Sequence, residues 1–161
     1  MIDTKIILNR FKEELNKRML ERGDKYKQVA LFTRTSNHEM LEYLQGDSFP
    51  EIWSLVLIAD YLGCSVDEML GYSNSHATDC KKIPASNVFY SRNIFADYFR
   101  EHLIKRMSDK HIDVNELAAL SGITKTRIEM YVSVHRWVPS VPYFLRICDA
   151  LDCTPTDLLG Y

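Results

Sequence analysis

The sequence lacks the features that mark membrane, secreted and metal-binding proteins. No apolar run reaches the roughly 18 residues that a membrane span needs, and the first residues mix charged with apolar side chains, unlike a secretory signal. The four cysteines form no CxxC motif and no Cys/His spacing typical of a metal site. We therefore expect a cytoplasmic protein without a membrane segment, a disulfide framework, a metal or a cofactor.

The chain also lacks an excess of positive charge and a recognisable catalytic motif. Its formal net charge is −2 at pH 7, which argues against strong non-specific affinity for DNA but leaves room for one basic face. It has no glycine-rich phosphate loop, and no grouping of acid, histidine and nucleophile recurs along it. We expect a protein that is not an enzyme and that has no small-molecule ligand.

What the chain does contain is an internal repeat. Residues 11–43 align with 99–131 at an offset of 88, residues 50–72 align with 139–161 at an offset of 89, and each block holds eight identical pairs. The change of offset places a one-residue insertion within 132–138. A unit of about 65 residues is too long for a solenoid repeat and long enough for a small domain. We predict two domains, 1–72 and 94–161, joined by a polar linker at 73–93.

Both repeats show helical periodicity and no strand-type alternation. Apolar residues recur at helical spacing over 7–19, and the second repeat follows the same pattern. Ser36 followed by Glu39 forms a capping box at the start of a helix, and Thr124 is the equivalent cap in the second repeat. The sequence therefore predicts an all-α protein with five helices in each repeat, ten in total.

One ordered set of residues occurs in both repeats. In the second repeat it consists of Leu117, Ala118, Gly122, Thr124, Ile128 and Pro139. In the first repeat it consists of Val29, Ala30, Ser36, Met40 and Pro50. This set resembles the helix-turn-helix of the phage-repressor family, the Xre-type group of lambda repressor and Cro. The resemblance implies two tandem five-helix lambda-repressor-like domains.

Three features depart from the family pattern, and the first is the one-residue insertion within 132–138, which follows the recognition helix of the second repeat. Arg34 stands where the turn usually has glycine. Many family members also bury an Arg–Glu pair between helix one and the recognition helix, where this chain has Met19 with Leu44 and Met107 with Val132. Replacing a whole buried ion pair by packed apolar side chains is often neutral or stabilising. We therefore expect each repeat to keep a packed core at these positions.

The resemblance implies that residues 37–44 and 125–132 are recognition helices, which lie in the major groove with their N-terminal residues at the base edges. By position, base contacts are expected from Asn37, His38 and Glu42 in the first repeat and from Lys125, Thr126 and Met130 in the second. Phosphate contacts are expected from Ser36, Thr124, Arg127, Arg34, Lys25, Lys27 and Arg136. The alternative for Lys125 and Arg127 is an ordinary solvated charge, and Glu39 and Glu42 make the first recognition helix locally acidic.

The sequence thus predicts a transcriptional regulator that binds double-stranded DNA sequence-specifically. A flexible linker of ~20 residues spans roughly 25 Å, and successive major-groove faces lie ~34 Å apart, so one chain can contact two half-sites. The half-sites should differ because the recognition helices differ. The alternative is a protein interaction or dimerisation module, as in an antitoxin or antirepressor, and homodimerisation is an option that the sequence leaves open.

Overall fold

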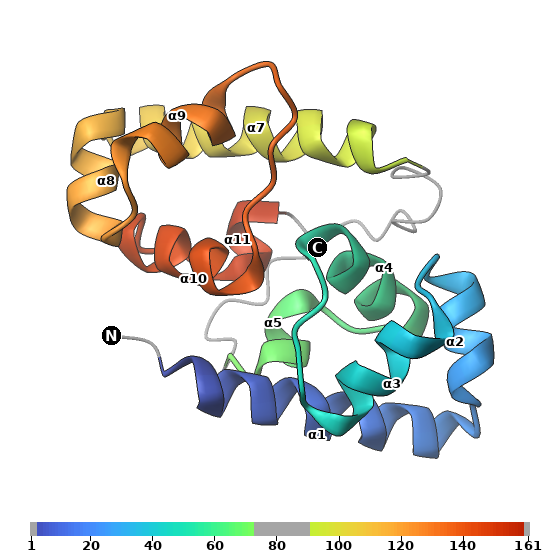
Figure 1. The fold of residues 1–161 in the computed structure, drawn as a ribbon. Helices are drawn as coiled ribbons and strands as arrows, with labels where there is room; N and C mark the ends of the chain where they lie inside the picture. Colours follow the sequence, from blue (N-terminus) through green and yellow to red (C-terminus); the bar gives the residue numbers. More distant parts are fainter. Residues whose placement is uncertain (1–2, 73–90, 160–161) are drawn as a thin grey trace.

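The computed structural model describes residues 3–72 and 91–159, which are almost entirely helical (Figure 1). The first segment contains α1 (Thr4–Arg22), α2 (Tyr26–Phe32), α3 (Asn37–Gln45), α4 (Ile52–Leu62) and α5 (Val66–Leu70). The second contains α7 (Arg92–Asp109), α8 (Val114–Ser121), α9 (Lys125–Val132), α10 (Val141–Ala150) and α11 (Pro155–Leu159). In these two segments the prediction of five helices per repeat is confirmed.

The predicted linker, 73–93, falls mostly outside the described residues, since only its last three residues belong to the second segment. Those three differ from the prediction. Ser91 caps α7 by accepting a hydrogen bond from the Ile94 backbone N–H at 3.3 Å, and Arg92 and Asn93 are already helical. Helix α7 begins two residues before Ile94, the first residue of the predicted domain. The cap at Ser91 starts the helix, and the residues that follow a cap do not have to be apolar.

The long helices α1 and α7 supply one apolar face to each repeat. Their buried residues recur at three- and four-residue spacing: Ile7, Phe11, Leu15 and Met19 in α1, and Phe95, Ala96, Phe99, Leu103 and Met107 in α7. Leu44 and Val132 pack against the same core. The apolar replacement of the family's buried ion pair is therefore part of a packed interior, as expected.

Equivalent helices have equivalent neighbours in the two repeats. Helix α1 packs against α3 and α5, and α7 packs against α9 and α11. Helix α2 packs against α3 and α4, and α8 packs against α9 and α10. The pair α2–α3 and the pair α8–α9 thus each have the helix, turn and helix order that the sequence predicted.

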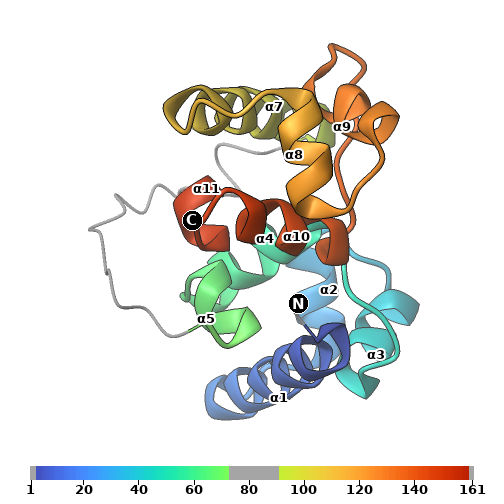
Figure 2. The same cartoon turned by 90° about the vertical axis from the view of Figure 1, so that its left-hand side faces the viewer.

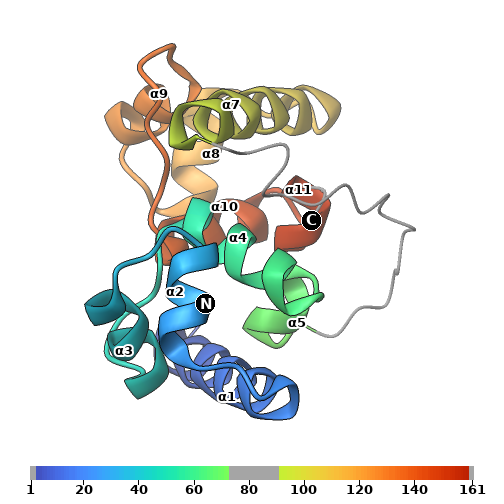
Figure 3. The same ribbon diagram turned by 90° about the vertical axis from the view of Figure 1, so that its right-hand side faces the viewer.

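The two repeats do not have separate interiors. Helices α4, α5, α10 and α11 lie in the middle of the molecule, between α1 and α7 (Figure 1, Figure 3). Helix α5 packs against α11, and the buried apolar residues of both repeats form one continuous cluster. The sequence predicted two domains joined by a linker, whereas in the structure the two repeats also pack against each other. A unit of about 65 residues leaves much apolar surface exposed when alone, and packing two together removes part of it from water.

Among the helices of residues 3–72 and 91–159, none has the length and apolar character that crossing a lipid bilayer demands.

Candidate nucleic-acid interface

The predicted recognition helices α3 and α9 lie on the same side of the molecule, at opposite ends of it (Figure 2, Figure 3). Both helices bury one face: Met40 and Tyr43 in α3, and Ile128 and Tyr131 in α9. Their N-terminal residues are exposed. The arrangement therefore offers two helix starts to one extended partner that runs along this side.

The start of α3 is closed by a complete capping box. The Ser36 hydroxyl donates to Glu39 Oε2 at 2.6 Å and accepts from the Glu39 backbone N–H at 3.1 Å. The Ser36 backbone N–H donates to the same carboxylate at 2.9 Å. These hydrogen bonds from Ser36 lower the pKa of the Glu39 carboxyl. The hydroxyl of Ser36 is thus engaged inside the protein, which limits its predicted role as a phosphate donor.

Asn37 and His38 project from the first turn of α3 and are exposed. The His38 side chain is 84% exposed, and its Nε2 lies 3.5 Å from Glu42 Oε1, one turn further along the helix. The structure therefore brings these two predicted base-reading residues together. A base edge would have to compete with this contact for either side chain.

The start of α9 is more open than that of α3. Thr124 is the N-cap, but its side chain makes no capping hydrogen bond. Lys125 and Thr126 follow on the exposed surface, and Met130 is half-buried. Lys125 Nζ lies 3.7 Å from Glu129 Oε1, with both side chains more than half exposed. Such an exposed pair is worth little in water, so the ammonium group can exchange it for a phosphate or a base.

Two of the predicted phosphate contacts are held by other parts of the second repeat. The Arg127 guanidinium lies over the Tyr143 ring of α10, 4.6 Å from its centroid. Arg136 Nε donates to both carboxylate oxygens of Asp97 on α7, each at 3.2 Å. Arg127 thus links α9 to α10, and Arg136 links the loop after α9 to α7. Sequence spacing did not indicate either partner.

The turn before α3 has the same backbone conformation as the turn before α9. Arg34 has φ 56° and Gly122, at the equivalent position, has φ 66°. A left-handed conformation suits glycine and is strained for arginine, so the arginine departs from the family pattern in residue type but not in geometry. Arg34 is exposed. Lys27 is also exposed, with Nζ 5.9 Å from the centroid of the Tyr26 ring.

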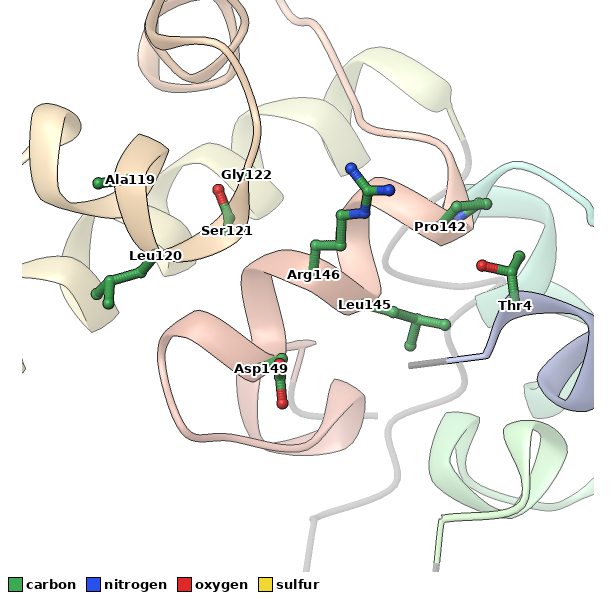
Figure 4. A pocket seen from close by; sticks show the side chains of 9 residues that line it. All are labelled: Thr4, Ala119, Leu120, Ser121, Gly122, Pro142, Leu145, Arg146 and Asp149. Atoms are coloured by element: carbon green, nitrogen blue, oxygen red, sulfur yellow. The ribbon is translucent and has the colours of Figure 1, made fainter. Parts of the chain in front are cut away.

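Two hollows were not indicated by the sequence. One, of about 420 Å³, lies between the segments that precede α4 and α10 and is lined by Phe49, Pro50, Glu51, Val138, Pro139, Ser140, Val141 and Pro142. The other, of about 460 Å³, lies between α8 and α10 beside Thr4 (Figure 4). Arg146 and Asp149 of α10 line it, and the hydroxyl of its Ser121 donates to the Leu117 carbonyl at 2.6 Å. That serine is therefore committed to a structural hydrogen bond.

Comparison with known proteins gives one match. Residues 102–161 match the family model described as the Cro/C1-type HTH DNA-binding domain. Searches of curated proteins and of solved structures returned no match. The matched residues run from the middle of α7 through α8, α9, α10 and α11. The second repeat is therefore similar to a Cro/C1-type helix-turn-helix domain, a similarity that points to a DNA-binding regulator.

Proposed function

We propose that this chain regulates transcription, in the manner of a repressor, by binding double-stranded DNA sequence-specifically. Helix α9 enters one major groove, and α3, in a second helix-turn-helix domain, enters another. Lys125 and Thr126 read bases in one half-site, and Asn37 reads bases in the other. The protein works in the cytoplasm as a binding protein and not as an enzyme.

The observation that carries this proposal is the shared placement of two exposed helix starts. Helices α3 and α9 lie on the same side of the molecule (Figure 2), their first residues are exposed, and α9 belongs to the part of the chain that matches a DNA-binding domain. Ser36 and Thr124 cap these helices at equivalent positions. In helix-turn-helix proteins this end of the recognition helix meets the base edges.

Selection from random duplex DNA tests the proposal. The full chain is incubated with the pool, bound duplexes are recovered and sequenced, and the cycle is repeated. We expect an enriched motif, bound more tightly than the starting pool. The matched control is the Lys125→Ala, Thr126→Ala double variant, which keeps the buried face of α9 intact and should lose preference in one half of the motif. Recovery of duplexes without any enriched motif would contradict sequence-specific binding.

A protein interaction module is the second candidate, because apolar side chains lie exposed at the end of α2. Leu31 is 78% exposed and Phe32 is 62% exposed, and Leu120, equivalent to Phe32, is 62% exposed. Exposed apolar groups are common where proteins meet. Salt dependence separates the two candidates. DNA affinity should fall steeply with salt, with a slope that counts phosphate contacts, whereas an apolar protein contact should change little.

A further inference from the structure

Two contacts between the repeats join residues that are equivalent in the internal alignment. Glu51 forms an antiparallel bridge with Ser140, its counterpart at the offset of 89. Asp67 meets Thr156, which is likewise its own counterpart at that offset. In an ordinary contact between two copies of a unit, a residue meets a different position of the other copy. A residue meets its own equivalent only on a two-fold axis.

Two such pairs define one axis through the molecule. The first pair lies just before α4 and α10, and the second lies in the first turns of α5 and α11. The hollow between the segments preceding α4 and α10 lies beside this pair, because Pro50 and Glu51 line it together with their counterparts Pro139 and Ser140. The repeats are therefore related as the subunits of a symmetric dimer are, but within one chain.

The contacts on this axis favour pairing of unlike repeats. The Thr156 backbone N–H donates to Asp67 Oδ1 at 2.8 Å, and the Asp67 backbone N–H donates to Thr156 Oγ1 at 3.2 Å. Asp67 is only 2% exposed. Two first repeats facing each other would bring two buried aspartates together, a costly arrangement of like charges. Near the axis, Arg92 Nε lies 2.9 Å from Glu51 Oε2 across the same interface.

From this geometry we infer that the chain is a preassembled dimer of its own two repeats, which presents α3 and α9 to one duplex at a fixed separation. Its target is one DNA site made of two unlike half-sites with a single allowed spacing, bound by one chain. The inference deepens the proposed function and rests on it. It replaces the flexible connection expected from the sequence by a rigid one.

Repeats that are held rigidly and repeats that move independently respond differently to a change in the distance between the two half-sites. Inserting 10 bp between half-sites keeps both on the same face of the duplex but moves them apart by about one further turn, ~34 Å. A chain whose repeats move independently can follow this change. A preassembled pair cannot, so it loses contact with one half-site and with it the gain of roughly 10²-fold or more that joint binding supplies.

A disulfide placed on the axis tests the interface directly. Paired Cα atoms in an antiparallel bridge lie about 4.5–5.5 Å apart, within the ~4.4–6.8 Å range of disulfides. We would prepare the full chain with Glu51→Cys and Ser140→Cys in a Cys80→Ser background, so that the Cys80 thiol cannot form a competing disulfide. The matched control carries Glu51→Cys alone. We expect rapid intramolecular cross-linking of the double variant and none in the control.

DNA binding by the cross-linked chain completes the test. On the duplex recovered by selection, the oxidised and reduced forms should bind within about twofold of each other as single chains, and the 10-bp insertion should weaken both by ~10²-fold or more. Failure to cross-link, loss of binding on cross-linking, or tolerance of the insertion would overturn the inference. If neither form binds any duplex, the proposed function fails, while cross-linking still decides whether the repeats pair as inferred.

Discussion

The Arg34 turn offers a prediction with a defined magnitude. Arg34 has φ 56°, where its equivalent Gly122 has φ 66°. A side chain in the left-handed region costs about 1–2 kcal/mol, and the greater freedom of unfolded glycine gives back about 0.5–1 kcal/mol. Arg34→Gly should therefore raise the free energy of unfolding by about 0.5–1 kcal/mol. For a chain of this length that corresponds to a Tm increase of about 2 °C.

Urea unfolding of the full chain measures this effect, and two variants serve as controls. Arg34→Ala removes the charge and the side-chain contacts but keeps the strain, so Arg34→Gly should be more stable than Arg34→Ala. Gly122→Ala should lower the free energy of unfolding by about 0.5–1 kcal/mol, because a Cβ there meets nothing within 4 Å and the cost is conformational alone. If glycine at position 34 is no more stable than alanine, the strain argument is refuted.

The remaining predictions concern the caps, the charges and one buried acid. Ser36→Ala should destabilise the chain by about 1 kcal/mol, measured by urea unfolding, whereas Thr124→Ala should mainly weaken DNA affinity, because its side chain makes no cap hydrogen bond. Lys125→Ala with Arg127→Ala should weaken binding, followed by fluorescence anisotropy, more than Asn37→Ala with His38→Ala; equal or reversed losses would show that local charge is the wrong guide. Burial raises the pKa of the Asp67 carboxyl above its ordinary value of 3.8. A raised folded pKa means stability that is present below the unfolded pKa and lost as pH rises through the folded pKa. The stability of Asp67→Asn relative to the parent chain should therefore increase from pH 3.5 towards neutral pH, and a decrease would contradict the sign.

Local patterns predicted the helices well because their causes are local. The capping box of Ser36 and Glu39 and the apolar face of α1 each depend on residues within one or two turns, and both occur as expected. The buried Ile128 and Tyr131 of α9 also follow helix periodicity, because residues three positions apart lie on one face of a helix.

Features that depend on distant residues were not predictable in the same way. Arg136 was expected at phosphate, but its guanidinium meets Asp97, a partner on another helix that only the fold brings near. Asp67 had the sequence signature of an ordinary acidic residue in the first turn of a helix. Its burial against Thr156 depends on how the repeats pair, and the alignment that relates the two positions carries no sign that they touch.

Both recognition helices must read bases if one chain binds two unlike half-sites, and one measurement tests this directly. The selected duplex is changed one base pair at a time, and the affinity of the parent chain, Asn37→Ala and Lys125→Ala is measured for every duplex. We expect Lys125→Ala to flatten the base preference in one half of the site only and Asn37→Ala to flatten it in the other half. Loss of affinity by an equal factor on all duplexes, with every preference intact, would contradict it.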